Sequence, residues 1–341
     1  MSFPSAPKDR IAELASLLSE PRKLAIITHY NPDGDALGSS LGLAHVLRAA
    51  GHQVQVVVPN VPAPFLNWLP GAEEVLVFDR SKDDGTAKLQ DADIVFCLDF
   101  NRQDRVGQAE EVLRNVPVKV LIDHHQDPEE FARVAFSDTA ACATCQMVFD
   151  IVSALGLASL ISVEAATCLY TGLVTDSGSF RFSSTRPHTM RVAADLMERG
   201  VIVERVHGAI MDDNTADRLR LLGFTLSERM QVFPELGAAV LHLSLADLRR
   251  FNFTPGDTEG FVNYGLSIRG IRISAFFMER PDLVKVSLRS KGSLPVDLFC
   301  KEHFNGGGHR NAAGGQGSDG LEAAMRKFME HLPAFMSQHP E

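Results

Sequence analysis

The chain has 341 residues, of which 45% are hydrophobic and 22% charged, and its formal net charge is -10 at pH 7. Such a chain is long enough for two domains with separate cores, and its negative charge argues against long duplex DNA as a partner. No apolar stretch approaches the roughly 18 residues of a membrane span and the first residues lack the apolar core of a signal peptide, so we expect a cytoplasmic protein without a membrane partner.

Apolar strands alternate with amphipathic helices in the first half of the chain. Strands are expected at 24–28, 53–58, 74–78, 93–99 and 118–122, with helices at 36–50 and 104–114. Almost continuously apolar strands are typical of a parallel sheet covered on both faces. We therefore predict an α/β domain built on a parallel sheet.

A second α/β pattern follows a helical middle section. Helices are expected at 139–155, 163–174 and 188–199, a polar connecting segment at 212–222, strands at 237–243, 272–279 and 283–289, and helices at 295–304 and 320–331. We predict a first domain over residues 1–200, a linker helix over 201–222 and a smaller α/β domain over 223–341.

The five cysteines suit a reducing compartment. Cys142 and Cys145 form a C-x-x-C sequence, but no second pair or nearby histidine follows them. We interpret these two as buried small side chains in a helical region rather than as metal ligands.

Acidic and histidine side chains follow three of the predicted strands. They are His29, Asp33 and Asp35 after the first strand, Asp99 at the end of "DIVFCLD", and Asp123, His124 and His125 after "VKVLI"; Asp176 follows a later apolar run, "YTGLVT". Ligands of open α/β sheets bind outside the carboxyl ends of the strands, so we expect these side chains to converge.

This set of side chains favours divalent cations. Carboxylates and imidazoles without a thiolate suit Mn²⁺ or Mg²⁺, or Co²⁺, better than structural zinc. Five carboxylates are too many for one ion, which predicts a pair of ions sharing one acid. Each acid taken alone has another interpretation, because an aspartate after a strand is commonly a helix cap or a turn residue.

The segments "HYNPDGDALGS", "CLDF", "LIDHH" and "GLVTDSGSF" resemble, in this order, the four motifs of the DHH phosphoesterase superfamily. The segments "GFVNYGLSIRGIRISAFFME", "KVSLRSKG" and "FNGGGHRNAAGG" look like its associated substrate domain. The likeness spans about residues 20 to 335 and is greatest to the bacterial nanoRNase/pAp phosphatase subfamily. It implies an active site in the cleft between the two domains, and a homodimer is common in the superfamily.

The resemblance also implies a role for each matching residue. His29, Asp33 and Asp99 would hold one ion, and Asp35, Asp99, His124 and Asp176 the other. Asp123 would orient a histidine, and His125 would contact the phosphate or assist the leaving group. The substrate would be bound by Arg105, Arg289, Ser290, Gly306, Gly307, Gly308 and His309.

Three local patterns have competing interpretations. "GSSLG" matches the hydrolase elbow G-x-S-x-G, but a helix already begins before Ser40, which predicts that Ser40 is a helix-surface or packing residue. "NGGGHRNAAGG" lacks the Walker ending, and we expect bare amides with a helix near His309 to form an anion cradle. Arg102 either binds phosphate or pairs with Asp104 or Asp127, and Phe180 and Phe182 are expected in the core.

We therefore expect a metal-dependent hydrolase that acts through a metal-bridging hydroxide. Its substrates would be short single-stranded RNA, including dinucleotides, cleaved to nucleoside monophosphates, and 3′-phosphoadenosine 5′-phosphate (pAp), converted to AMP. An acidic protein suits short substrates because phosphate contacts scale with length. The alternatives are a phosphodiesterase acting on cyclic or linear dinucleotides and, from a different class, a non-catalytic nucleotide sensor.

Overall fold

The computed structural model describes residues 6–340, which form two units that divide between Asp213 and Asn214. Each unit has its own sheet and its own hydrophobic core. Within the described residues, no helix is both long and apolar enough to cross a bilayer.

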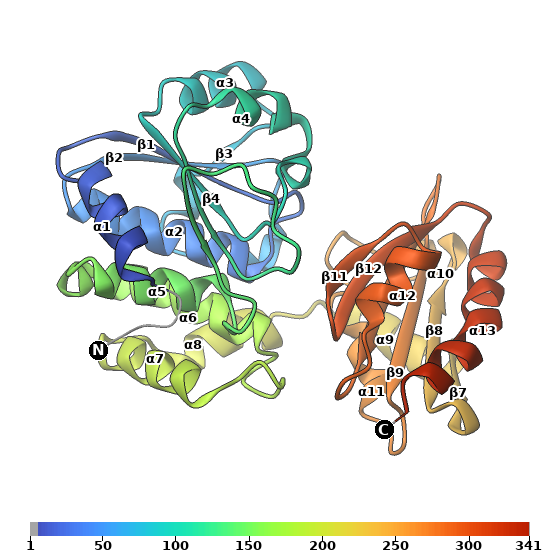
Figure 1. Ribbon diagram of the computed structural model, residues 1–341. Coiled ribbons are helices and arrows are strands. Elements are labelled where there is room, and N and C mark those ends of the chain that lie inside the picture. The colour runs from blue at the N-terminus through green and yellow to red at the C-terminus, as the bar shows by residue number, and fades with distance from the viewer. Residues whose placement is uncertain (1–5, 341) are drawn as a thin grey trace. The chain divides into compact units, whose positions relative to one another are not determined.

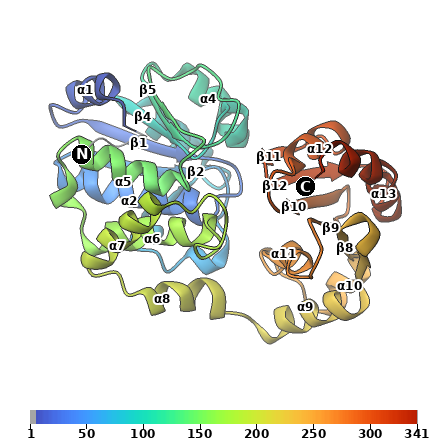
Figure 2. The same ribbon diagram turned by 60° about the horizontal axis from the view of Figure 1, so that its bottom comes forward.

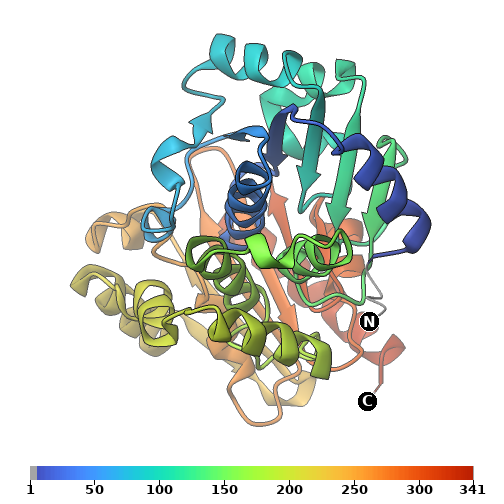
Figure 3. The same ribbon diagram turned by 90° about the vertical axis from the view of Figure 1, so that its left-hand side faces the viewer.

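The first unit is built on a six-stranded sheet in the order β3-β2-β1-β4-β5-β6. Every neighbouring pair of strands is parallel, and Figure 3 shows β4 and β5 running in one direction. The strands are β1 (Lys23–Thr28), β2 (Gln53–Val58), β3 (Leu76–Val77), β4 (Ile94–Leu98), β5 (Lys119–Asp123) and β6 (Val134–Ser137). The predicted α/β architecture is confirmed.

Helices cover both faces of this sheet. Figure 1 shows α3 and α4 on one side and α2, α5 and α6 on the other. Alternate residues of β1 serve the two cores: Ile26 packs with the α2 side and Ile27 with the opposite side. The helices are α1 (Lys8–Leu17), α2 (Gly34–Ala49), α3 (Lys82–Gln90), α4 (Glu110–Asn115), α5 (Thr144–Ala154), α6 (Val163–Asp176), α7 (Pro187–Glu198) and α8 (Val203–His207).

The structure differs from the sequence predictions at several element ends, and α1, α3 and β6 were not predicted. The helix predicted at 139–155 begins only at Thr144, and the helix predicted at 104–114 starts within a 3₁₀ segment, Gln103–Ala109. The prediction of Phe182 as a core residue is wrong, because its side chain is 39% exposed, whereas Phe180 packs against the core. Cys142 and Cys145 are buried, as predicted.

The second unit contains a mixed sheet in the order β11-β12-β10-β9-β8-β7, in which only the β8–β9 pair is parallel. The strands are β7 (Met230–Phe233), β8 (Ala238–Leu243), β9 (Ile273–Glu279), β10 (Val284–Ser290), β11 (Gly307–His309) and β12 (Ala312–Gly317). Their helices are α9 (Ala216–Glu228), α10 (Leu245–Arg250), α11 (Phe261–Leu266), α12 (Val296–His303) and α13 (Leu321–Gln338). Figure 2 shows α12 and α13 on one face and α9 to α11 on the other.

Candidate active site

Most of the predicted site residues of the first unit follow the carboxyl ends of three adjacent parallel strands, whereas Asp176 is the last residue of α6. His29 directly follows β1, Asp99 directly follows β4, and Asp123 is the last residue of β5. Because β4 lies between β1 and β5 in the sheet, Asp99 is central. The expected convergence of distant segments is therefore observed.

One group of three side chains contains His29, Asp33 and Asp99. The Nε2 atom of His29 lies 3.5 Å from Oδ2 of Asp99 and 3.9 Å from Oδ1 of Asp33. On its other side the ring donates from Nδ1 to the carbonyl of Tyr30 at 2.9 Å, which leaves Nε2 facing the acids. Asp33 also caps α2, since its Oδ1 accepts the backbone N–H of Asp35. The cap interpretation of Asp33 is therefore confirmed, and its distance to His29 is compatible with the ligand interpretation.

A second group contains Asp35, His124 and Asp176. The Nε2 atom of His124 lies 3.7 Å from Oδ2 of Asp35 and 3.5 Å from Oδ2 of Asp176. It also lies 3.5 Å from Oδ1 of Asp99, so the two oxygens of Asp99 face the two histidines. Asp99 is placed as a carboxylate shared by both groups.

The backbone of Asp99 adopts a conformation that side chains rarely tolerate. Its φ is +65°, in the left-handed region. Backbone strain of this kind costs on the order of 1–3 kcal/mol and clusters at functional sites. The strain places the carboxylate, which is almost fully buried, between the histidines.

His125 and Asp123 form a separate pair beside these groups. Nδ1 of His125 donates to Oδ1 of Asp123 at 2.8 Å, as the predicted orienting role of Asp123 requires. Asp123 is fully buried, and its Oδ2 atom has no hydrogen-bond partner within residues 6–340.

The crowded acids perturb the pKa values of the site. Burial alone would lower the pKa of His29, but the carboxylates of Asp99 and Asp33 outweigh it and raise the value to about 9. Burial and the charges of Asp99 and Asp176 raise the pKa of Asp35 well above its usual range. Burial opposes ionisation of Asp99 as well, yet contact with His124 and His29 holds its pKa well below the usual range.

The donor set fits divalent cations. Within each of the two groups the ligand atoms lie within 4.8 Å of one another. Two atoms bound to one ion at about 2.1 Å can be at most about 4.2 Å apart, so small shifts would bring each group onto an ion. Imidazole and carboxylate ligands without a thiolate agree with this class of ion.

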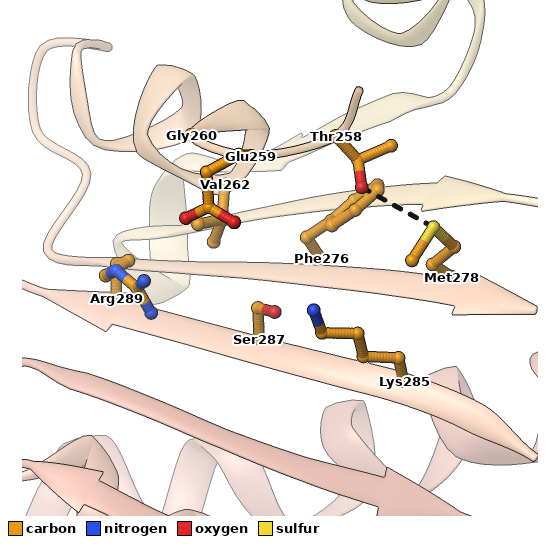
Figure 4. Close-up of a pocket in the computed structure, with 9 residues that line it drawn as sticks. All are labelled: Thr258, Glu259, Gly260, Val262, Phe276, Met278, Lys285, Ser287 and Arg289. Atoms are coloured by element: carbon orange, nitrogen blue, oxygen red, sulfur yellow. Dashed lines mark hydrogen bonds between the residues drawn. The ribbon is translucent and has the colours of Figure 1, made fainter. Parts of the chain in front are cut away.

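Arg289 of the second unit lines a small pocket on one face of its sheet. Lys285, Ser287 and Arg289 alternate along β10 and therefore point to the same face, with Glu259 opposite them (Figure 4). The predictions missed Lys285, Ser287 and Glu259. The alternation of polar residues along the predicted strand 283–289 was the signal that could have identified the first two.

The glycine run forms a hairpin, so the helix predicted near His309 is wrong. Gly307 to His309 form β11, which pairs with β12 at the edge of the sheet. Only glycine fits at two positions: a Cβ on Gly306 would lie 2.0 Å from the carbonyl oxygen of Gly314, and Gly308 has a φ of +142°. An edge strand still presents one row of unpaired backbone groups, so anion binding by this run stays a prediction.

Three other predicted residues have clear surroundings. Ser290 is buried, and its hydroxyl donates to the carbonyl of Leu294. Ser40 is buried and donates to Ala36, which confirms its packing role. Arg102 pairs with Asp104.

Arg105 is exposed and forms no ion pair with any residue in the described part of the chain. Its side chain is therefore available for an anion from solvent. Its backbone carbonyl accepts the N–H of Tyr30, which ties this segment to the one that carries His29.

A parallel sheet with histidines and carboxylates arranged around a shared aspartate defines a phosphoesterase of the kind that uses divalent cations. Residues 23–173 match the DHH family, N-terminal domain, and residues 237–338 match the DHHA1 domain. The chain belongs to the DHH family of phosphoesterases.

Two relatives carry the name bifunctional oligoribonuclease and PAP phosphatase NrnA. The protein from Thermus thermophilus is 33% identical, covering 96% of this chain and 95% of its own. The protein from Bacillus subtilis is 27% identical, covering 89% and 91%. A crystal structure of an exopolyphosphatase-related protein from Bacteroides fragilis superposes with a TM-score of 0.95 at 34% identity, covering 99% of both chains.

Proposed function

We propose that the chain hydrolyses short oligoribonucleotides to nucleoside monophosphates and converts pAp to AMP. The observation that supports this most strongly is the position of Asp99 between two groups of ligands. The near full-length likeness to relatives named for both activities supports the choice of substrates. The buried free cysteines also agree with a cytoplasmic protein.

We assign His29, Asp33 and Asp99 to one cation and Asp35, Asp99, His124 and Asp176 to the other. When bound, two divalent cations, with Mn²⁺ as the preferred ion, would supply Lewis-acid stabilisation of the phosphate and would lower the pKa of water. The carboxylates would offset the charge of the cations, and the hydrogen bond from Nδ1 of His29 to the carbonyl of Tyr30 keeps Nε2 turned toward Asp33 and Asp99.

His125 is the proposed group that contacts the reacting phosphate or protonates the leaving oxygen. Its Nδ1 atom donates to Asp123, and we assign the contact with the substrate to Nε2. The buried carboxylate of Asp123 fixes the orientation of the His125 ring. Loss of Asp123 should therefore lower kcat more than substrate affinity.

The second unit and Arg105 would bind the rest of the substrate. Arg289 offers a planar pair of donors that suits phosphate, and the edge strand carrying Gly306, Gly307, Gly308 and His309 offers backbone amides. The buried hydroxyl of Ser290 supports this end of β10, and a direct contact with phosphate would require it to leave Leu294. An acidic protein with few cationic donors suits a substrate of a few nucleotides.

A substrate panel tests the proposal. Purified protein with Mn²⁺ is given dinucleotides, five-nucleotide RNA, long RNA, pAp, pyrophosphate and cyclic dinucleotides, and the products are separated chromatographically. We expect turnover of the short RNAs and of pAp, and loss of both activities in Asp99→Ala. Selective turnover of cyclic dinucleotides, or nucleotide binding with no turnover, would overturn the proposal. Size measurements on the same sample test whether this chain forms the homodimer that is common in the superfamily.

A further inference from the structure

The first turn of α5 contacts two of the proposed ligands. The backbone N–H groups of Thr144 and Cys145 donate to the two carboxylate oxygens of Asp35, at 2.6 and 2.9 Å. The hydroxyl of Thr144 donates to Oδ1 of Asp99 at 2.8 Å. Thr144 and Cys145 are fully buried, so water does not compete for these hydrogen bonds.

The hydroxyl of Thr144 does not serve its own helix. A threonine at a helix start commonly accepts an N–H of the first turn. Here Ala143 is the N-cap residue, and no side chain caps α5. The single hydroxyl proton is directed to Asp99, from a residue that lies 45 positions further along the chain. This geometry suits a role in orienting a ligand better than a role in starting the helix.

We propose that the N-terminal turn of α5 is a positioning element for the ion pair, with Thr144 as the positioning residue for Asp99. The proposal rests on the proposed function of the site. A carboxylate rotates freely about its last bond unless its oxygens are held. Thr144 fixes one oxygen of Asp99, and the two amides fix both oxygens of Asp35. The partial positive charge of the helix start also favours the ionised carboxylates.

Close packing holds α5 at this distance. A Cβ added to Gly172 of α6 would lie 2.2 Å from Sγ of Cys145 and 2.7 Å from Oδ1 of Asp35. The absence of a side chain there lets α6, the first turn of α5 and Asp35 meet directly. The hydrogen bonds of the turn therefore depend on a backbone that the helix packing keeps in place.

The test compares Mn²⁺ binding by variants at two buried threonines. Thr144→Val keeps the shape of the side chain but removes the hydroxyl, and Thr144→Ser keeps the hydroxyl. Thr225→Val is the matched control, because Thr225 is also fully buried but donates to Leu221 within α9 of the other unit. Mn²⁺ affinity is measured on metal-free protein by calorimetry and by the free-ion resonance signal, without substrate.

We expect Thr144→Val to bind Mn²⁺ about 10- to 100-fold more weakly, as for other residues that orient metal ligands. Thr144→Ser should bind like the unmodified chain, and so should Thr225→Val. Unchanged affinity in Thr144→Val, or an equal loss in Thr144→Ser, would overturn the proposal. Should the valine variant not fold, Thr144→Ala provides the same comparison. An unmodified protein that binds Mn²⁺ but hydrolyses neither short RNA nor pAp would refute the proposed function alone.

Discussion

Replacing Asp176 with asparagine tests the electrostatics of the site in the absence of a cation. Burial raises the pKa of Asp176 from its usual 3.8 to about 6; His124 opposes this shift, and the charges of Asp33 and Asp99 add to it. Its side chain is 26% exposed, so the environment is largely shielded from solvent. A shift of about two units corresponds to about 3 kcal/mol, at about 1.4 kcal/mol for each unit.

The direction of the change in folding stability with pH follows from the number of protons that the folded and unfolded states bind. Because the pKa is higher in the folded protein, the folded state holds more protons than the unfolded state between pH 3.8 and about pH 6. The ionised carboxylate therefore destabilises the metal-free protein above pH 6, and this penalty disappears as the pH falls to about 4. Asparagine resembles the neutral acid at every pH. Asp176→Asn should raise the free energy of unfolding at pH 8 by about 1–3 kcal/mol and by about half as much at pH 5.

The assay is thermal unfolding after treatment with a chelator. For a unit of this size, each kcal/mol raises Tm by about 2–4 °C. Asp83→Asn, at an exposed site in the first turn of α3, is the control and should change Tm little. With Mn²⁺ present, Asp176→Asn should unfold at a lower Tm than the unmodified chain, because the variant lacks a ligand and is stabilised less by metal binding. A metal-free variant no more stable than the unmodified chain at pH 8, or one whose advantage grows as pH falls, would refute the reasoning.

Three further predictions concern the ions, the packing and the substrate. His29 has a pKa of about 9 and must be neutral to bind a metal, so Mn²⁺ affinity should rise with pH up to about 9, and binding should release protons. Calorimetry in buffers of different ionisation enthalpy measures the number of protons released. Binding without proton release would contradict this prediction. Gly172→Ala should cost about 1–3 kcal/mol in urea unfolding because of its contacts, whereas Gly223→Ala, which has open space around it, should be neutral or stabilising. Arg289→Gln should raise KM for pAp by about 10- to 100-fold, since a charge-assisted hydrogen bond is worth about 1.5–3 kcal/mol. Arg326→Gln, which removes an exposed ion pair, is the control and should leave KM unchanged. An equal effect of both substitutions would exclude a specific role for Arg289.

The main features of the first unit are predictable from sequence because a parallel sheet brings its strand ends to one edge. That rule is sufficient to bring His29, Asp99 and His124 together, although they are far apart in the chain. Thr144 could not be found in this way. Two of the three hydrogen bonds of its turn come from backbone amides, and no sequence pattern marks an amide that faces a carboxylate. Because the helix was predicted to start at residue 139, Thr144 was not recognised as part of the first turn of α5.

The glycine run of the second unit shows a different limit of sequence reasoning. Glycine is depleted in strands because it lacks a packing side chain and gains freedom on unfolding, so propensity favours a loop for residues 306–308. The hairpin can form because glycine at positions 306 and 308 lets the neighbouring backbone approach more closely than any Cβ would allow. Such an approach depends on the register between β11 and β12, which is a tertiary property.

The first unit compensates its crowded acids without a permanent cation. Within residues 6–340, no lysine or arginine forms a salt bridge with Asp35, Asp99 or Asp176; their partners are histidines, backbone amides and a hydroxyl. A lysine among these acids would stabilise the metal-free protein, but its charged group would occupy the position of the ion, and its displacement would weaken metal binding. Imidazoles hold protons when no metal is bound and release them when one binds, whereas amides and a hydroxyl remain in place in both states. The lower stability predicted for the metal-free site above pH 6 is therefore a consequence of keeping it able to bind metal.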